Sequence, residues 1–95
     1  MNINEMMKNA KRLQDELAKE TEKLYVKEFK VEKHGIVVVM LGSRRLKSVI
    51  IDPALVDPEE PELIGDLVIL AVNEVLEIID EEQEALNAKF APAGF

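Results

Sequence analysis

Hydrophobic residues at the start of the chain recur about every 3.5 positions, a spacing typical of an α-helix that packs along one face. They are Ile3, Met6, Met7, Ala10, Leu13, Leu17 and Leu24, joined by Thr21. On a helix these residues fill an arc of roughly 140°, and charged residues occupy the remainder. Asn2 or Asn4 can cap the first turn. We therefore predict a helix over residues 3–24 whose narrow apolar seam suits one partner helix or a sheet edge.

The period then changes to two, which predicts β-strands. Over residues 25–33 the apolar Tyr25, Phe29 and Val31 alternate with a second set of positions, as in a half-exposed edge strand. This second set is Val26, Glu28, Lys30 and Glu32. Residues 36–41 are apolar throughout, and 46–51 form a third candidate strand. The turns expected at 34–35 and 42–45 are short, so the three strands should form an antiparallel meander that ends before Pro53.

A second, longer helix is predicted over about residues 58–89. The segment 57–60 resembles a capping box with Pro58 at the first helical position, while Pro61 leaves the start open by a turn. One polar stripe follows this helix: Asp66, Asn73, Glu77, Asp80 and Glu84. We predict that residues 90–95 form a loose tail. The whole chain, 1–95, is thus predicted to be a single α+β domain of order α-β-β-β-α with a three-stranded antiparallel sheet.

The uninterrupted apolar run at 36–41 predicts a dimer. A sheet with one solvent-exposed face alternates apolar and polar residues, so a strand without alternation needs cover on both faces. The second helix can cover one face, but the first helix has too narrow a seam to cover the other. A second copy of the chain, related by a two-fold axis, is the simplest cover.

Composition argues against catalysis, metal binding and membrane insertion. The chain has no cysteine, so disulfides and thiolate metal sites are excluded. His34 is the only histidine, Ser43 and Ser48 lie in no nucleophile motif, and the glycines are too scattered for a phosphate loop. The longest apolar run is far shorter than a membrane span, and no signal peptide is evident. We expect a cytoplasmic non-enzyme without catalytic residues, cofactor, metal or membrane partner.

Charge is distributed unevenly along the chain. The net charge is −7, but residues 1–48 carry +4 and residues 49–95 carry −11. An anionic partner would therefore have to meet the first half of the chain.

Basic residues in that first half form two clusters that could contact DNA phosphates. Lys8, Arg12, Lys19 and Lys23 fall within about 60° of one helix face, and Lys11 flanks them. The second cluster, in and beside the turn at 42–45, comprises Arg44, Arg45 and Lys47. The alternative interpretation of the first cluster is a solvated helix face. Glu5 and Asp15 fall on the same face, and the cations can pair at i,i+4 with Asp15 and Glu16.

Several sequence segments occur in a distinctive order and spacing, the most specific being 49–55 (VIIDPAL) followed by 63–73 (LIGDLVILAVN). Others are the Met- and Lys-rich segment 6–10, Gly35-x-Val37-x-Val39 and Gly42 in the hairpin. With these segments, the chain as a whole resembles the YbaB/EbfC family of bacterial nucleoid-associated proteins. The resemblance implies a protomer that dimerises through its sheet with projecting helices. It also implies DNA binding with little sequence preference at the bacterial nucleoid, without enzyme activity or cofactor.

A second hypothesis is a dimeric protein-interaction module whose acidic second helix binds an unidentified basic or hydrophobic protein partner. Reversing the charges of Lys8 and Arg12 separates the two hypotheses, because only the first predicts that DNA binding is abolished.

Overall fold

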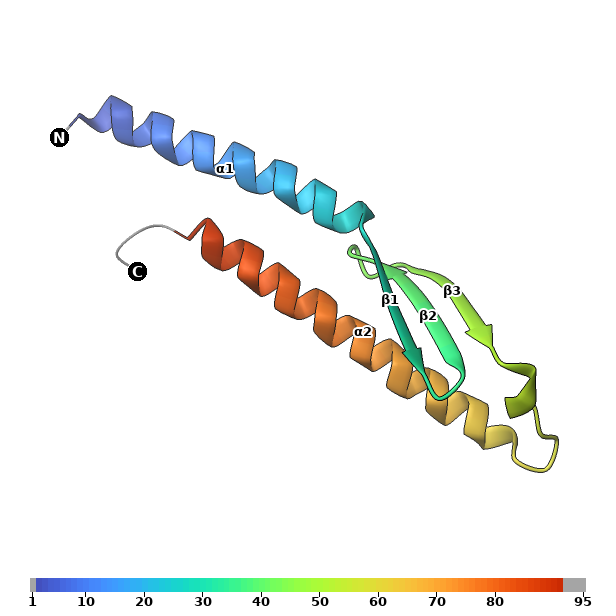
Figure 1. Ribbon diagram of the computed structural model, residues 1–95. Helices are drawn as coiled ribbons and strands as arrows, with labels where there is room; N and C mark the ends of the chain where they lie inside the picture. The colour runs from blue at the N-terminus through green and yellow to red at the C-terminus, as the bar shows by residue number, and fades with distance from the viewer. Residues whose placement is uncertain (1, 92–95) are drawn as a thin grey trace.

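The computed structural model describes residues 2–91 and has the element order α-β-β-β-α, which confirms the predicted α+β class (Figure 1). The elements are α1 (Ile3–Val26), β1 (Glu28–Lys33), β2 (Ile36–Leu41), β3 (Leu46–Ile51), a 3-10 turn η1 (Pro53–Leu55) and α2 (Pro61–Lys89).

Helix α1 extends past its predicted end, so the prediction that a strand begins at Tyr25 was wrong. Asn2 caps the helix by accepting a hydrogen bond from the Asn4 amide at 3.0 Å. At the other end Tyr25 remains helical, and its carbonyl accepts from the Ser43 amide of the β2–β3 hairpin at 3.2 Å. Leu24 is buried beneath this contact. A tertiary contact therefore decides where the helix ends, and alternation alone could not show it.

The three strands form an antiparallel sheet in the order β1-β2-β3, as expected of a meander. His34 and Gly35 connect β1 to β2 with φ values of 51° and 86°, the left-handed pair that a tight hairpin turn requires. One face of the sheet is the core, where the following side chains are buried: Phe29, Val31, Ile36, Val38 and Met40. The opposite positions of β2 are only half-buried.

Helix α2 begins at Pro61, about one turn later than the predicted residue 58. Asp57 accepts a hydrogen bond from the Glu59 amide at 2.9 Å in a turn before the helix, so the predicted capping box was wrong. Pro61 occupies the first helical position instead, where its missing N–H costs nothing. The predicted tail begins with Phe90 and Ala91, and its remaining residues, 92–95, lie outside the described part of the chain.

The buried face of α2 is a stripe at four-residue spacing. Ala71, Val75 and Ile79 are completely buried, whereas the predicted polar stripe is exposed throughout. The buried stripe packs mainly on β1 and β2. The alanine is the smallest of the three, which lets the helix backbone approach the sheet closely.

The molecule is elongated because both helices continue beyond the sheet (Figure 1). Its principal extents are 71 × 22 × 14 Å and its radius of gyration is 19.5 Å. A compact chain of this length would have a radius of about 12 Å. Helix α1 and the C-terminal half of α2 lie side by side and antiparallel, forming an arm that leaves the sheet. Over the described residues, neither helix is long and apolar enough to cross a membrane.

Candidate nucleic-acid interface

The basic residues of α1 lie on the face opposite to its apolar seam. The buried Leu24 of α1 and the half-buried Leu17, Glu20 and Thr21 face α2. Since successive residues are turned by 100°, Lys8 and Arg12 point the other way and Lys11 lies at the side. Lys19 and Lys23 border grooves that Lys89 of α2 also lines. All five side chains are exposed. This face, which we call the basic face, carries five cations together with the exposed acidic residues Glu5, Asp15 and Glu16.

Most of these α1 cations have no carboxylate partner in the described structure. Lys23 pairs with Glu20 at 3.1 Å, but the i,i+4 pairs expected of Lys11, Arg12 and Lys19 do not form among the described residues. The interpretation of this face as a set of neutralised helix pairs therefore has little support from the geometry.

The hairpin cluster is anchored to the end of α1. The Gly42 amide donates to the Lys27 carbonyl at 2.9 Å, next to the Ser43–Tyr25 hydrogen bond. Arg44, which has a φ of 70°, pairs with Asp80 of α2. Lys47 pairs with Glu28 of β1, while Arg45 is exposed and has no ion pair in the described chain. This second cluster is therefore partly neutralised, unlike the first.

Acidic residues of α2 account for much of the internal ion pairing. Glu82 pairs with Lys27 at 2.6 Å and Glu74 with Lys33 at 3.4 Å, in addition to the Asp80–Arg44 pair. All of these side chains are at least one-third exposed. Such surface pairs contribute about 0–1 kcal/mol each, so phosphates can compete with the carboxylates for the cations.

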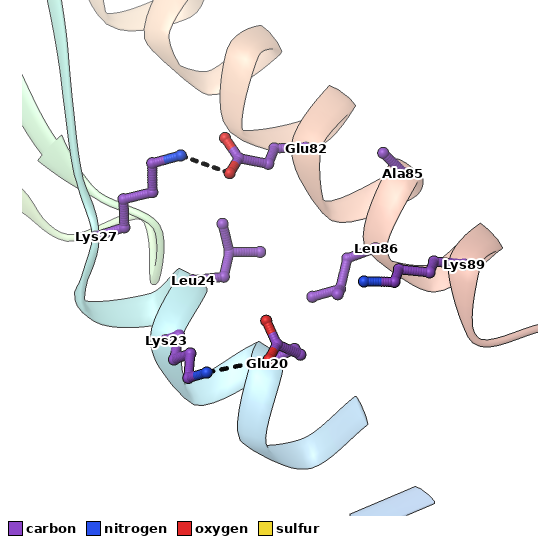
Figure 2. A pocket seen from close by; sticks show the side chains of 8 residues that line it. All are labelled: Glu20, Lys23, Leu24, Lys27, Glu82, Ala85, Leu86 and Lys89. Carbon is purple, nitrogen blue, oxygen red and sulfur yellow. Dashed lines mark hydrogen bonds and ion pairs between the residues drawn. The ribbon is translucent and has the colours of Figure 1, made fainter. Parts of the chain in front are cut away.

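A groove of about 380 Å³ separates the two helices of the arm (Figure 2). Its apolar lining is Leu24, Ala85 and Leu86, and charged side chains line the rest. Lys27 and Lys89 join Lys23 at this groove, although neither was a candidate from the sequence. Their residue numbers differ by more than 60, so only the antiparallel arrangement of α1 and α2 brings them together, and no sequence spacing could indicate it.

Candidate catalytic groups are not assembled into a site. His34 is exposed in the β1–β2 turn, and Ser43 is exposed in the β2–β3 turn. Within residues 2–91, no group of three or more His, Asp or Glu side chains could hold a metal ion.

Comparison with known proteins identifies the class to which this arrangement belongs. The profile of the YbaB/EbfC DNA-binding family matches residues 1–95, and the chain belongs to that family. It is therefore a nucleoid-associated DNA-binding type of protein and not an enzyme, as the resemblance implied.

Two relatives and one solved structure illustrate the similarity. A nucleoid-associated protein of Metamycoplasma arthritidis is 57% identical over 91 residues, which covers 96% of each chain. One of Mycoplasmopsis pulmonis is 45% identical over 94 residues, covering 99% of this chain and 93% of the relative. The crystal structure of an uncharacterized protein from Helicobacter pylori superposes with a TM-score of 0.78 at 18% identity, covering 94% of this chain and 96% of that one. This last similarity supports the fold.

The family-like segment 49–55 now has a structural explanation. The Asp52 side chain accepts from the Ala54 amide at 2.9 Å, and Pro53 starts η1, so this segment makes a capped turn after β3. The Asp52 amide donates to the Gly35 carbonyl at 2.9 Å, which joins this turn to the β1–β2 turn. A Cβ at Gly35 would lie 3.0 Å from Leu55, so the two turns pack closely.

Proposed function

We propose that this protein is a homodimer that binds the phosphates of duplex DNA with little sequence preference, at the nucleoid in the bacterial cytoplasm. The observation that carries the proposal is the unpaired basic face of α1. Lys8, Lys11, Arg12 and Lys19 are exposed on a projecting arm and have no carboxylate within ion-pair distance among the described residues. Contacts of lysine and arginine with phosphates supply affinity without reading base sequence.

The proposed phosphate contacts are those predicted from sequence. The full set is Lys8, Lys11, Arg12, Lys19, Lys23, Arg44, Arg45 and Lys47. Those on α1 should contribute most, because Arg44, Lys47 and Lys23 must first leave a carboxylate. The net charge of −7 repels DNA, so the affinity for DNA should depend on the local cations and not on the overall charge of the protein.

Exposed apolar residues at and near the edge strand β3 support the dimer. Helix α2 packs mainly on β1 and β2, and β3 is an edge strand. Ile50 and Leu46 of β3 and Ile69 of α2 are exposed. An apolar edge strand left open is prone to non-specific association, and a second copy placed over β3 would cover it. A dimer would carry two arms, and binding with both arms would increase the affinity for DNA.

Fluorescence anisotropy of a labelled duplex, measured at several salt concentrations, tests the DNA proposal. The logarithm of the binding constant should fall linearly with the logarithm of salt concentration. Replacing Lys8 and Arg12 by Gln should reduce that slope by about 0.9 for each phosphate that is no longer neutralised. Duplexes of unrelated sequence should bind with nearly equal affinity.

A matched control is the Lys30→Gln, Lys33→Gln variant. It likewise removes two positive charges, but from β1. Lys33 also loses its ion pair with Glu74, so circular dichroism should first show that this variant is folded. It should keep the slope of the parent protein. If both variants weaken binding equally, net charge and not the face of α1 governs affinity. If the unmodified protein binds no duplex at low salt, the second hypothesis, a protein partner for acidic α2, takes precedence.

A further inference from the structure

The groove between the two helices of the arm gathers several lysines. Its charged lining comprises three lysines, Lys23, Lys27 and Lys89, and two glutamates, Glu20 and Glu82. Lys89 is the only basic residue of the segment 49–95, which holds twelve acidic residues, and it lies at the groove with two lysines from the end of α1. Like charges repel one another, so an anion at this groove would be stabilised.

Two of the three lysines are paired with carboxylates. Lys23 pairs with Glu20 at 3.1 Å, within α1, and Lys27 pairs with Glu82 at 2.6 Å. Of these two pairs, only Lys27–Glu82 crosses the groove to α2 (Figure 2). Lys89 has no carboxylate within ion-pair distance among residues 2–91. Glu82 therefore occupies a cation that the groove would otherwise present to an anion.

Lys27 extends the row of proposed phosphate contacts on α1. Lys19, Lys23 and Lys27 follow one another at four-residue intervals, and Lys23 and Lys27 line the same groove. The Lys27 ammonium also lies 5.0 Å from the centre of the Phe29 ring. Such a cation–π contact attracts the ammonium whether or not Glu82 is charged. A duplex that contacts Lys23 through one phosphate can therefore bring a neighbouring phosphate to Lys27.

We infer that Lys27 is a further phosphate contact, which Glu82 withholds from DNA. A phosphate that approaches Lys27 meets the Glu82 carboxylate, and the two anions repel each other. The side chains of Lys27 and Glu82 are 53% and 40% exposed, so the pair contributes little to stability and its removal leaves the fold intact. This inference rests on the proposed function, because it assumes that DNA lies along α1.

The Glu82→Gln variant tests the inference, because it removes the charge of the carboxylate and keeps the length and helix propensity of the side chain. In anisotropy titrations of a labelled duplex, it should bind up to about fivefold more tightly than the parent protein at low salt. The slope of the logarithm of affinity against the logarithm of salt concentration should become steeper by about 0.9, since one more phosphate is neutralised.

The matched control is Glu81→Gln, which changes the net charge by the same amount. Glu81 is the neighbour of Glu82 in α2, but it is exposed, does not line the groove and has no ion pair in the described chain. This variant should keep the salt slope of the parent protein. Denaturant midpoints of both variants should show that each is folded.

A double-mutant comparison isolates the release of Lys27 from other effects of Glu82→Gln. Lys27→Gln alone should leave the salt slope close to that of the parent protein, in which Glu82 occupies this lysine. Adding Glu82→Gln to Lys27→Gln should then increase the affinity no more than adding Glu81→Gln does. As an independent measurement, the methyl NMR signals of Leu24 and Leu86, which line the groove, should shift more when duplex is added to Glu82→Gln than to the parent protein.

Three outcomes overturn the inference and leave the proposed function intact, because the parent protein still binds DNA in each. Equal slopes for Glu82→Gln and Glu81→Gln would show that the overall charge alone sets the affinity. A gain that persists in the Lys27→Gln background would exclude Lys27 as the contact. A lower denaturant midpoint of Glu82→Gln without tighter DNA binding would assign the ion pair a purely structural role. If the parent protein binds no duplex at low salt, the proposed function fails, and the inference fails with it.

Discussion

At the scale of single residues, Gly42 shows how tightly the hairpin meets α1. A Cβ built at this position would lie 1.9 Å from the Leu24 carbonyl oxygen, a backbone atom that cannot move aside. The Gly42 amide also donates a hydrogen bond to the Lys27 carbonyl. The hydrogen at Cα is thus the largest substituent that fits where the arm joins the sheet.

The Gly42→Ala substitution should therefore lower the free energy of unfolding by about 1–3 kcal/mol, the usual cost of overpacking. The measurement is a denaturant midpoint at fixed protein concentration. Because the clash lies at the junction of α1 and the hairpin, hydrogen exchange should increase most at the amides of Lys27, Gly42 and Ser43.

Gly65 provides a control with the opposite sign. It lies within α2, and a Cβ there meets no atom within 4 Å in the described structure. Gly65→Ala should stabilise the protein by about 0.5–1 kcal/mol, because alanine loses less backbone entropy in a helix. Equal effects of the two substitutions would contradict the tight junction at Gly42.

At the scale of elements, α2 has adjacent isoleucines with opposite environments. Ile79 is completely buried in the stripe that packs on the sheet, whereas Ile78 is 40% exposed. Successive residues of a helix are rotated by 100°, so the two side chains point in different directions. The stripe, rather than the overall hydrophobicity of α2, attaches the helix to the sheet.

Ile79→Ala should destabilise the fold by about 2–5 kcal/mol, because the side chain is no longer buried and a cavity remains in its place. Ile78→Ala should change stability by no more than about 1 kcal/mol, because the surface change is offset partly by the higher helix propensity of alanine. Thermal or urea unfolding compares the two directly. A large destabilisation by Ile78→Ala would mean that a partner subunit buries this side chain.

At the scale of the whole molecule, the exposed apolar surface of β3 predicts where two protomers contact each other in a dimer. Ile50 is 61% exposed and lies on the sheet face opposite to α2, paired across the strands with Val37. A charge at this exposed position is tolerable in one chain, but it would be unfavourable inside a dimer contact.

Ile50→Glu should convert the dimer into a folded monomer, with the molar mass measured by light scattering. Val56→Glu is the matched control, since Val56 is 63% exposed and lies in the loop before α2. That variant should remain dimeric. A parent protein that is monomeric at micromolar concentration, or an Ile50→Glu variant that stays dimeric, would refute the dimer contact at β3.

Much of the fold and the basic face of α1 could be predicted from the sequence because both follow from local periodicity. The 3.5-residue spacing from Ile3 to Leu24 indicated α1 and placed Lys8 and Arg12 opposite to the seam. The short turns expected at 34–35 and 42–45 indicated an antiparallel meander, and β2 is indeed flanked by β1 and β3. These features depend only on residues within one element.

Only the tertiary structure decided where the elements end and which charges remain free. Tyr25 stays helical because the hairpin docks on it, and α2 begins at Pro61 because Asp57 turns the chain first. Arg44 pairs with Asp80, 36 positions away, while Lys8 and Arg12 find no partner in the described chain. Lys27 of α1's C-terminal end and Lys89 of α2 meet at one groove. These features join distant segments, so their physical cause is the packing of α1, the hairpin and α2, which local spacing does not encode.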